Sequence, residues 1–133
     1  MEKDPRNKIV LIVWNDPCAH ADHIEREGVC PGGDTYLGEN ERMAAFRICV
    51  EETGLTPVLL RPLHTGQHSP AGAMRPTTYH VFVAMVRVSL DLASGNRVGD
   101  PGWKVTSVLT AEKQPATLND AIRETLATFE DSF

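Results

Sequence analysis

The stretch Gly32–Leu55 constrains the fold of this chain most, because it joins a glycine-rich loop to a helix with recognisable ends. The turn at Pro31–Gly33 precedes a polar-to-apolar run of about four helical turns. The run stops at Gly54, where a left-handed cap residue is favoured. The pattern therefore predicts a loop, a helix over Asn40–Thr53 and a second loop.

The predicted helix has two chemically different faces. At about 100° per residue, Phe46, Cys49 and Val50 share one face, and we expect these three side chains to be buried. The opposite face carries Arg47, Ile48, Glu51 and Glu52. Two neighbouring carboxylates repel each other, and a Mg²⁺ ion would relieve that repulsion. The alternative is a solvated face with an Arg47–Glu51 ion pair.

The spacing of these residues resembles the signature box of the Nudix hydrolases. The matching positions are Gly33, Glu39, Arg47, Glu51, Glu52, Gly54 and Leu55. The resemblance implies an α/β fold, a Nudix-like α/β/α sandwich with a central mixed sheet, as one domain over residues 1–133. It also implies metal-dependent hydrolysis of a nucleoside-diphosphate-linked or related diphosphate substrate. Glu51 and Glu52 would hold Mg²⁺ or Mn²⁺, and Arg47 would orient Glu51 for catalysis.

The resemblance extends to residues outside the helix. Gly32 and Gly33 are expected to bind substrate in the glycine loop, with Glu39 at the junction between loop and helix. The family often has an acidic residue just before a tryptophan that joins the metal site. Asp100 is the nearest match here, and Asp91 is a weaker one.

One box position departs from the family pattern, because Ile48 stands where a glutamate usually follows the arginine. The helical projection places Ile48 between the two box glutamates, on the metal-facing arc. We consider three alternatives. The first is an enzyme with weakened metal binding and slow turnover. The second is a Nudix-fold module that binds a nucleotide or a protein without catalysis, and the third is an assembly subunit with an empty pocket.

The remaining chain predicts strands, one further helix and two long loops. The expected strands are Ile9–Val13 at the centre of the sheet, an edge strand near Glu25–Cys30, Thr56–Leu63, Val81–Leu90 and Lys104–Leu109. A final helix over Leu118–Phe129 is expected to begin with Thr117 as its N-cap. His64, His68 and Arg75 lie in a predicted loop, where they would either reach a phosphate or a base or simply be solvated.

A cysteine and histidine cluster follows the first strand. Cys18, His20 and His23 offer one sulfur and two nitrogen donors of the kind zinc accepts. A fourth ligand is missing at a typical distance, so a solvent-exposed loop is the competing interpretation. Cys18, Cys30 and Cys49 show no paired spacing, which predicts free thiols in a reducing compartment.

Composition limits the classes of protein that this chain can belong to. The net charge of −5 disfavours a nucleic-acid surface, and the longest apolar run, residues 81–86, is too short to span a membrane. The charged N-terminus lacks the apolar segment of a secretory signal, which predicts a cytoplasmic protein. We expect a small nucleotide or diphosphate partner, and a homodimer is an assembly that the sequence allows.

Overall fold

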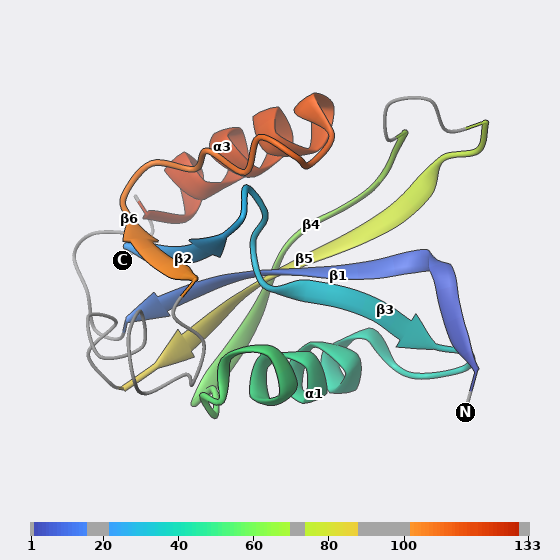
Figure 1. Cartoon of the computed structure of the whole chain (residues 1–133), viewed down its shortest axis with the longest axis horizontal. Helices are drawn as coiled ribbons and strands as arrows, with labels where there is room; N and C mark the ends of the chain where they lie inside the picture. Colours follow the sequence, from blue (N-terminus) through green and yellow to red (C-terminus); the bar gives the residue numbers. More distant parts are fainter. Residues whose placement is uncertain (1, 16–21, 70–73, 88–101, 131–133) are drawn as a thin grey trace.

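A computed structural model describes residues 2–15, 22–69, 74–87 and 102–130. The strands are β1 (Lys3–Asn15), β2 (His23–Arg26), β3 (Gly32–Tyr36), β4 (Leu59–His68), β5 (Thr77–Val86) and β6 (Trp103–Thr106). The helices are α1 (Glu41–Thr53) and α3 (Ala116–Glu130). Figure 1 shows α1 on one side of the main sheet and α3 on the other. The predicted α/β sandwich with a mixed central sheet is confirmed.

The main sheet has the strand order β3-β1-β5-β4. Strand β1 runs parallel to β5 and antiparallel to β3, while β4 and β5 are antiparallel, so the sheet is mixed. The segment Ile9–Trp14 is buried throughout, because α1 and α3 cover the two faces of this central strand. The prediction of a central first strand is therefore confirmed.

Alternate residues of the central strands contribute to two separate hydrophobic cores. The core beneath α1 contains Ile9, Leu11 and Val13 together with Ala45 and Ile48 of the helix. The core beneath α3 contains the alternating residues of β1, such as Ile12, with the helix residues Leu118, Ile122 and Leu126. This division assigns each buried apolar side chain of β1 and β5 to one side of the sheet.

Strands β2 and β6 form a separate antiparallel pair. In this pair Ile24 lies opposite Val105 and packs in the core beneath α1. Its neighbours His23 and Glu25 are also buried, and the alternation of a strand directs them to the other face. The short strand β2 thus places polar side chains inside the protein.

Helix α1 has the predicted ends but a different buried face. The Asn40 side chain accepts hydrogen bonds from the first-turn amides, and Gly54 ends the helix with a φ of 71°. The prediction that Phe46 and Val50 are buried is wrong, since their exposed fractions are 45% and 39%. Cys49 is buried as expected. The buried residues of α1 are Ala44, Ala45, Ile48, Cys49 and Thr53.

Several predicted boundaries shift. Strand β4 continues to His68, so His64 and His68 belong to a strand and not to a loop. Helix α3 begins at Ala116, which places Thr117 inside its first turn and not at the N-cap. The exposed-loop interpretation is wrong for His23, which is buried in β2, and Cys18 and His20 lie outside the described residues. Among the described residues, no helix is long and apolar enough to cross a membrane.

Candidate functional site

The Arg47 side chain connects strand β3 to helix α1; the loop predicted at Gly32 and Gly33 is the start of this strand. Its guanidinium donates two hydrogen bonds of 3.0 Å to the Glu39 carboxylate and one of 3.0 Å to Glu51. It also donates to the Asp34 carbonyl at 3.2 Å and lies 4.2 Å over the Tyr36 ring. Because a guanidinium presents donors in a rigid fork, one residue fixes strand β3, the turn at Glu39 and helix α1 relative to one another.

The Glu39 carboxylate closes the turn between β3 and α1. It accepts a hydrogen bond from the Tyr36 amide in addition to those from Arg47. The hydrogen bonds from Arg47 keep the pKa of Glu39 below its usual value despite partial burial. Glu39 therefore has a structural role at the junction where the sequence places it.

We expect Arg47→Lys to destabilise the protein by about 1–2 kcal/mol at pH 7, because lysine cannot replace the two-pronged bond to Glu39. A carboxyl group with a depressed pKa stabilises the fold above its unfolded pKa, near 4.3, and loses that contribution as the pH falls through its folded pKa. The difference between native and variant unfolding midpoints in urea should therefore shrink between pH 5 and about 3. Arg75→Lys, at an exposed arginine, is the control. An equal difference at both pH values would contradict the assignment.

The second box glutamate meets an arginine from the smaller sheet. Arg26 of β2 donates to Glu52 at 3.3 Å, and its guanidinium lies 4.5 Å over the Trp103 ring. The indole Nε1 of Trp103 is buried and has no hydrogen-bond partner among the described residues. The Trp103, Arg26 and Glu52 side chains thus form a stack that links β6 and β2 to the end of α1.

The two box glutamates remain accessible to solvent in different degrees. The exposed fraction of the side chain is 57% for Glu51 and 36% for Glu52. Ion pairs at such positions contribute only about 0–1 kcal/mol, so either carboxylate can exchange its arginine for another partner at little cost.

Ile48 occupies a buried position against Gly33 of strand β3. Its exposed fraction is 2%, and a Cβ built on Gly33 would lie 3.7 Å from the Ile48 Cδ1 atom. The helical projection placed Ile48 on an arc that faces a metal. This placement is wrong, because Ile48 is buried in the core beneath α1. Hydrocarbon packing fills the place where the family has a carboxylate.

Gly32 has a backbone role that its sequence position alone did not show. A Cβ at this residue would lie 2.3 Å from the Ile9 carbonyl oxygen, so only glycine fits between β3 and β1. The binding of substrate by Gly32 or Gly33 stays a prediction.

Other predicted site residues lie apart from the box. The His64 Nε2 lies 2.9 Å from the His68 Nε2, and His68 bonds the Thr117 hydroxyl of α3, so this pair faces α3 and not α1. Arg75 is exposed just before β5 and has no contact with the box among the described residues. Asp100 and the weaker candidate Asp91 lie outside the described residues.

Sequence reasoning missed Arg26 and Glu25, and it grouped His23 with Cys18 and His20 and not with Glu25. The signal was the alternation of a four-residue strand, which puts Ile24 and Arg26 on one face and His23 and Glu25 on the other. Such a short alternation was not distinguishable from a loop without the partner strand β6.

Comparison with known proteins identifies the fold. No protein-family model matches the sequence, and no curated protein matches it significantly. Among solved structures, a mutT/nudix family protein from Listeria innocua is 17% identical with a TM-score of 0.68, over 100% of this chain and 98% of that one. The chain has the Nudix fold. The resemblance found in the box is thus confirmed at the level of the fold.

Two further solved structures with this fold are named together with a nucleotide. The Ap4A hydrolase of C. elegans is 17% identical with a TM-score of 0.65, over 97% of this chain and 98% of that one. The NUDIX domain of Shewanella oneidensis NrtR, crystallised with ADP ribose, is 15% identical with a TM-score of 0.57, over 93% and 90%.

Proposed function

We propose that this Nudix-fold chain is a slow, metal-dependent hydrolase of a nucleoside-diphosphate-linked substrate. The observation that carries the proposal is the accessible pair of carboxylates, Glu51 and Glu52, at the end of α1. Both are held by arginines that bind them weakly enough to release them. Two acidic groups are therefore available to a cation once they leave their arginines, although the third position is Ile48.

The donor set fits a weakly bound hard cation. Glu51 and Glu52 offer oxygen ligands, whereas Ile48 offers none, and the box acids do not form a compact group of three donors among the described residues. Mg²⁺ keeps several waters and is commonly bound by one or two carboxylates together with substrate phosphates. Two carboxylates therefore suffice for a Mg²⁺ or Mn²⁺ site that substrate completes.

The chain's own residues would position the reacting groups. A cation bound at Glu51 and Glu52 would neutralise the diphosphate and lower the pKa of an attacking water. Arg47 holds the Glu51 carboxylate in place through its second anchor at Glu39. Arg26, once released from Glu52, would turn its guanidinium toward a phosphate, a partner that matches its fork of donors.

The structural neighbours support a diphosphate substrate. Ap4A and ADP ribose, the compounds named with two of them, both contain phosphates linked through a shared oxygen. Their names support a diphosphate as the substrate class that we propose for this chain.

Hydrolysis by the native chain should depend on Glu52. We expect slow release of nucleotide from nucleoside diphosphate derivatives with Mg²⁺ or Mn²⁺, and a loss of about 100-fold or more in Glu52→Gln, or about 3 kcal/mol of barrier. Glu41→Gln, at an exposed carboxylate in the first turn of the same helix, should leave the rate unchanged. Equal rates in Glu52→Gln and the native chain would show that the box does not catalyse the reaction.

A second candidate function is a binding module without catalysis. The packing of Ile48 against Gly33 favours it, because a hydrocarbon there removes a negative charge and excludes water. This candidate predicts nucleotide binding by calorimetry that does not depend on Mg²⁺, with no product released by the native chain.

A further inference from the structure

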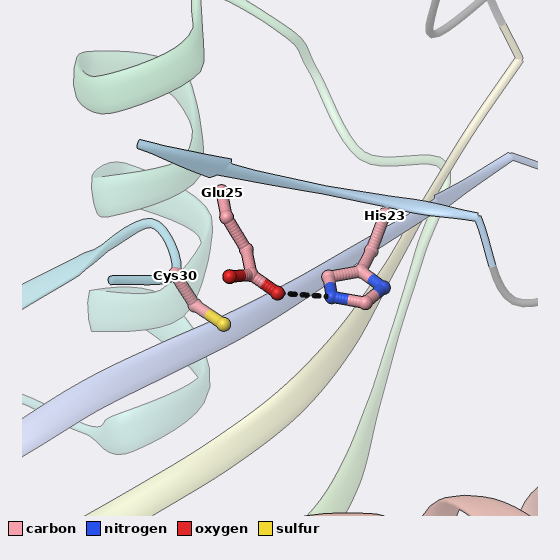
Figure 2. Close-up of side chains that lie close together, drawn as sticks. All are labelled: His23, Glu25 and Cys30. Atoms are coloured by element: carbon pink, nitrogen blue, oxygen red, sulfur yellow. Dashed lines mark hydrogen bonds and ion pairs between the residues drawn. The ribbon is translucent and has the colours of Figure 1, made fainter. Parts of the chain in front are cut away.

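A cluster of three metal-binding side chains is buried on the opposite face of β2 from the Nudix box. Donor atoms of His23, Glu25 and Cys30 all lie within 4.8 Å of one another. Figure 2 shows the His23 ring, the Glu25 carboxylate and the Cys30 sulfur directed toward one another, with His23 and Glu25 on the same strand. Their exposed fractions are 1%, 4% and 5%.

The Glu25 carboxylate is held in place by the segment before α3. It accepts hydrogen bonds from the Thr110 and Ala111 amides at 3.0 and 2.8 Å, from the Thr110 hydroxyl and from the His23 Nε2 at 2.9 Å. Burial opposes ionisation of Glu25, but these hydrogen bonds outweigh it and lower the carboxyl pKa. A fixed, ionised carboxylate is the form that binds a cation.

The burial of the Cys30 thiol next to two polar side chains is not explained by hydrogen bonds. Its backbone amide donates to Gln114, but its sulfur has no hydrogen-bond partner among the described residues. It packs in the core beneath α3 with its sulfur turned toward Glu25. A buried sulfur beside a fixed carboxylate and an imidazole has the surroundings of a metal ligand.

We propose that His23, Glu25 and Cys30 bind a divalent transition metal of the zinc class. A sulfur, a nitrogen and an oxygen donor favour such an ion over Mg²⁺, which prefers oxygen alone. On binding, the Cys30 S–H loses its proton to solvent as the sulfur–metal bond forms. The proton that the His23 Nε2 donates to Glu25 leaves that nitrogen and the neutral ring carries its proton on Nδ1, so Nε2 exchanges its hydrogen bond to Glu25 for a bond to the metal, which Glu25 also binds. One carboxylate and one thiolate then balance the two positive charges, which limits the cost of burial.

The geometry needs only small movements. Ligand distances of about 2.0–2.3 Å around zinc place neighbouring donors roughly 3.3–3.8 Å apart. The 2.9 Å contact between His23 and Glu25 would widen slightly, and donors that now lie up to 4.8 Å apart would close by about 1 Å. Glu25 also lines a surface cavity of about 860 Å³ with Gly28 and Lys104. We expect an ion and a fourth, water ligand to reach the cluster from the side of this cavity.

The bound ion would join three parts of the fold. His23 and Glu25 lie on β2, Cys30 lies just before β3, and Glu25 is bonded to residues 110 and 111 before α3. The site is separate from the Nudix box, where Arg26 on the other face of β2 meets Glu52. A metal here therefore acts on stability and need not act on hydrolysis.

The test is a titration of the native chain with Co²⁺, a coloured substitute for Zn²⁺. We expect a thiolate-to-cobalt absorption band that saturates at one equivalent, is displaced by Zn²⁺ and persists in excess Mg²⁺. Cys30→Ala should abolish the band, whereas Cys18→Ala should retain it. The control His64→Gln, which removes the contact between His64 and His68, should also retain the band. No band in the native chain, or an unchanged band in Cys30→Ala, would overturn the proposal.

Two further measurements cover a variant that does not fold. His23→Gln keeps the thiolate, so the absorption band should remain. The Co²⁺ concentration that half-saturates the band should rise by about tenfold or more. Zn²⁺ should raise the Tm of the native chain, and a chelator should reverse the shift. A native Tm that does not respond to Zn²⁺ would also overturn the proposal, whether or not the Mg²⁺-dependent hydrolysis is observed.

Discussion

Glu25→Gln should destabilise the metal-free protein by about 3–5 kcal/mol, one of the largest effects expected of any single substitution in this chain. The buried carboxylate accepts bonds from two backbone amides, one hydroxyl and His23. A glutamine amide would turn an NH₂ group toward at least one of these donors, which would lose its partner without access to water. Urea unfolding with a chelator present measures the loss.

The matched control is Glu27→Gln, two residues along the chain, where the side chain is exposed. This variant should change the unfolding free energy by less than about 0.5 kcal/mol. A similarly small loss in Glu25→Gln would mean that the segment before α3 is not fastened through this carboxylate.

Ile48→Glu should destabilise the metal-free protein by several kcal/mol and make its stability depend on Mg²⁺. Ile48 is 2% exposed in the core beneath α1, so an ionised side chain there loses its hydration and a hydrocarbon contact. The variant places a third carboxylate beside Glu51 and Glu52. Bound Mg²⁺ should then raise the free energy of unfolding by about 2.7 kcal/mol when its concentration is 100 times its Kd. Thermal unfolding with and without Mg²⁺ measures both effects.

Ile48→Gln separates the charge from the loss of packing. Glutamine has nearly the same shape as glutamate but does not bind Mg²⁺ strongly, so this variant should be destabilised without recovery by the metal. If Ile48→Glu proves as stable as the native chain without Mg²⁺, the side chain is not enclosed as described. Equal responses of both variants to Mg²⁺ would separate Ile48 from the cation site.

The ends of α1 and the central strand were predictable because each depends on local chemistry. Asn40 and Gly54 are residues that start and stop helices wherever they occur, and the β-branched run Ile9–Val13 favours a strand covered on both sides. These features need no knowledge of distant parts of the chain.

The buried face of α1 was not predictable by the same means. The apolar residues of α1 are spread around the whole helix. A helical projection therefore does not decide whether Phe46 and Val50 or Ile48 face the core. The small residues Ala44 and Ala45 decide the matter, because they let the helix approach β1 and β3 closely. That choice depends on the shape of the sheet, which the helix sequence does not contain.

The spacing that resembles a Nudix box was readable from the sequence, but the contacts of its residues were not. Arg47 binds Glu51 one helical turn away, as the alternative interpretation of an ion pair required, and also reaches back to Glu39. The partner of Glu52 is Arg26, which comes from a strand far away in the sequence. In the pairing of β2 with β6, that arginine lies opposite Trp103, a contact that the sequence around Glu52 does not contain.

The most direct test of the account is the affinity of the chain for Mn²⁺, measured by calorimetry with a non-hydrolysable diphosphate nucleotide present. We predict one weak site in the native chain. The affinity for Mn²⁺ should fall about tenfold or more in Glu51→Gln and in Glu52→Gln. It should not change in the control Glu41→Gln. Nucleotide binding that is unchanged by Mn²⁺ in the native chain and in both site variants would contradict the proposed cation site and leave a binding module.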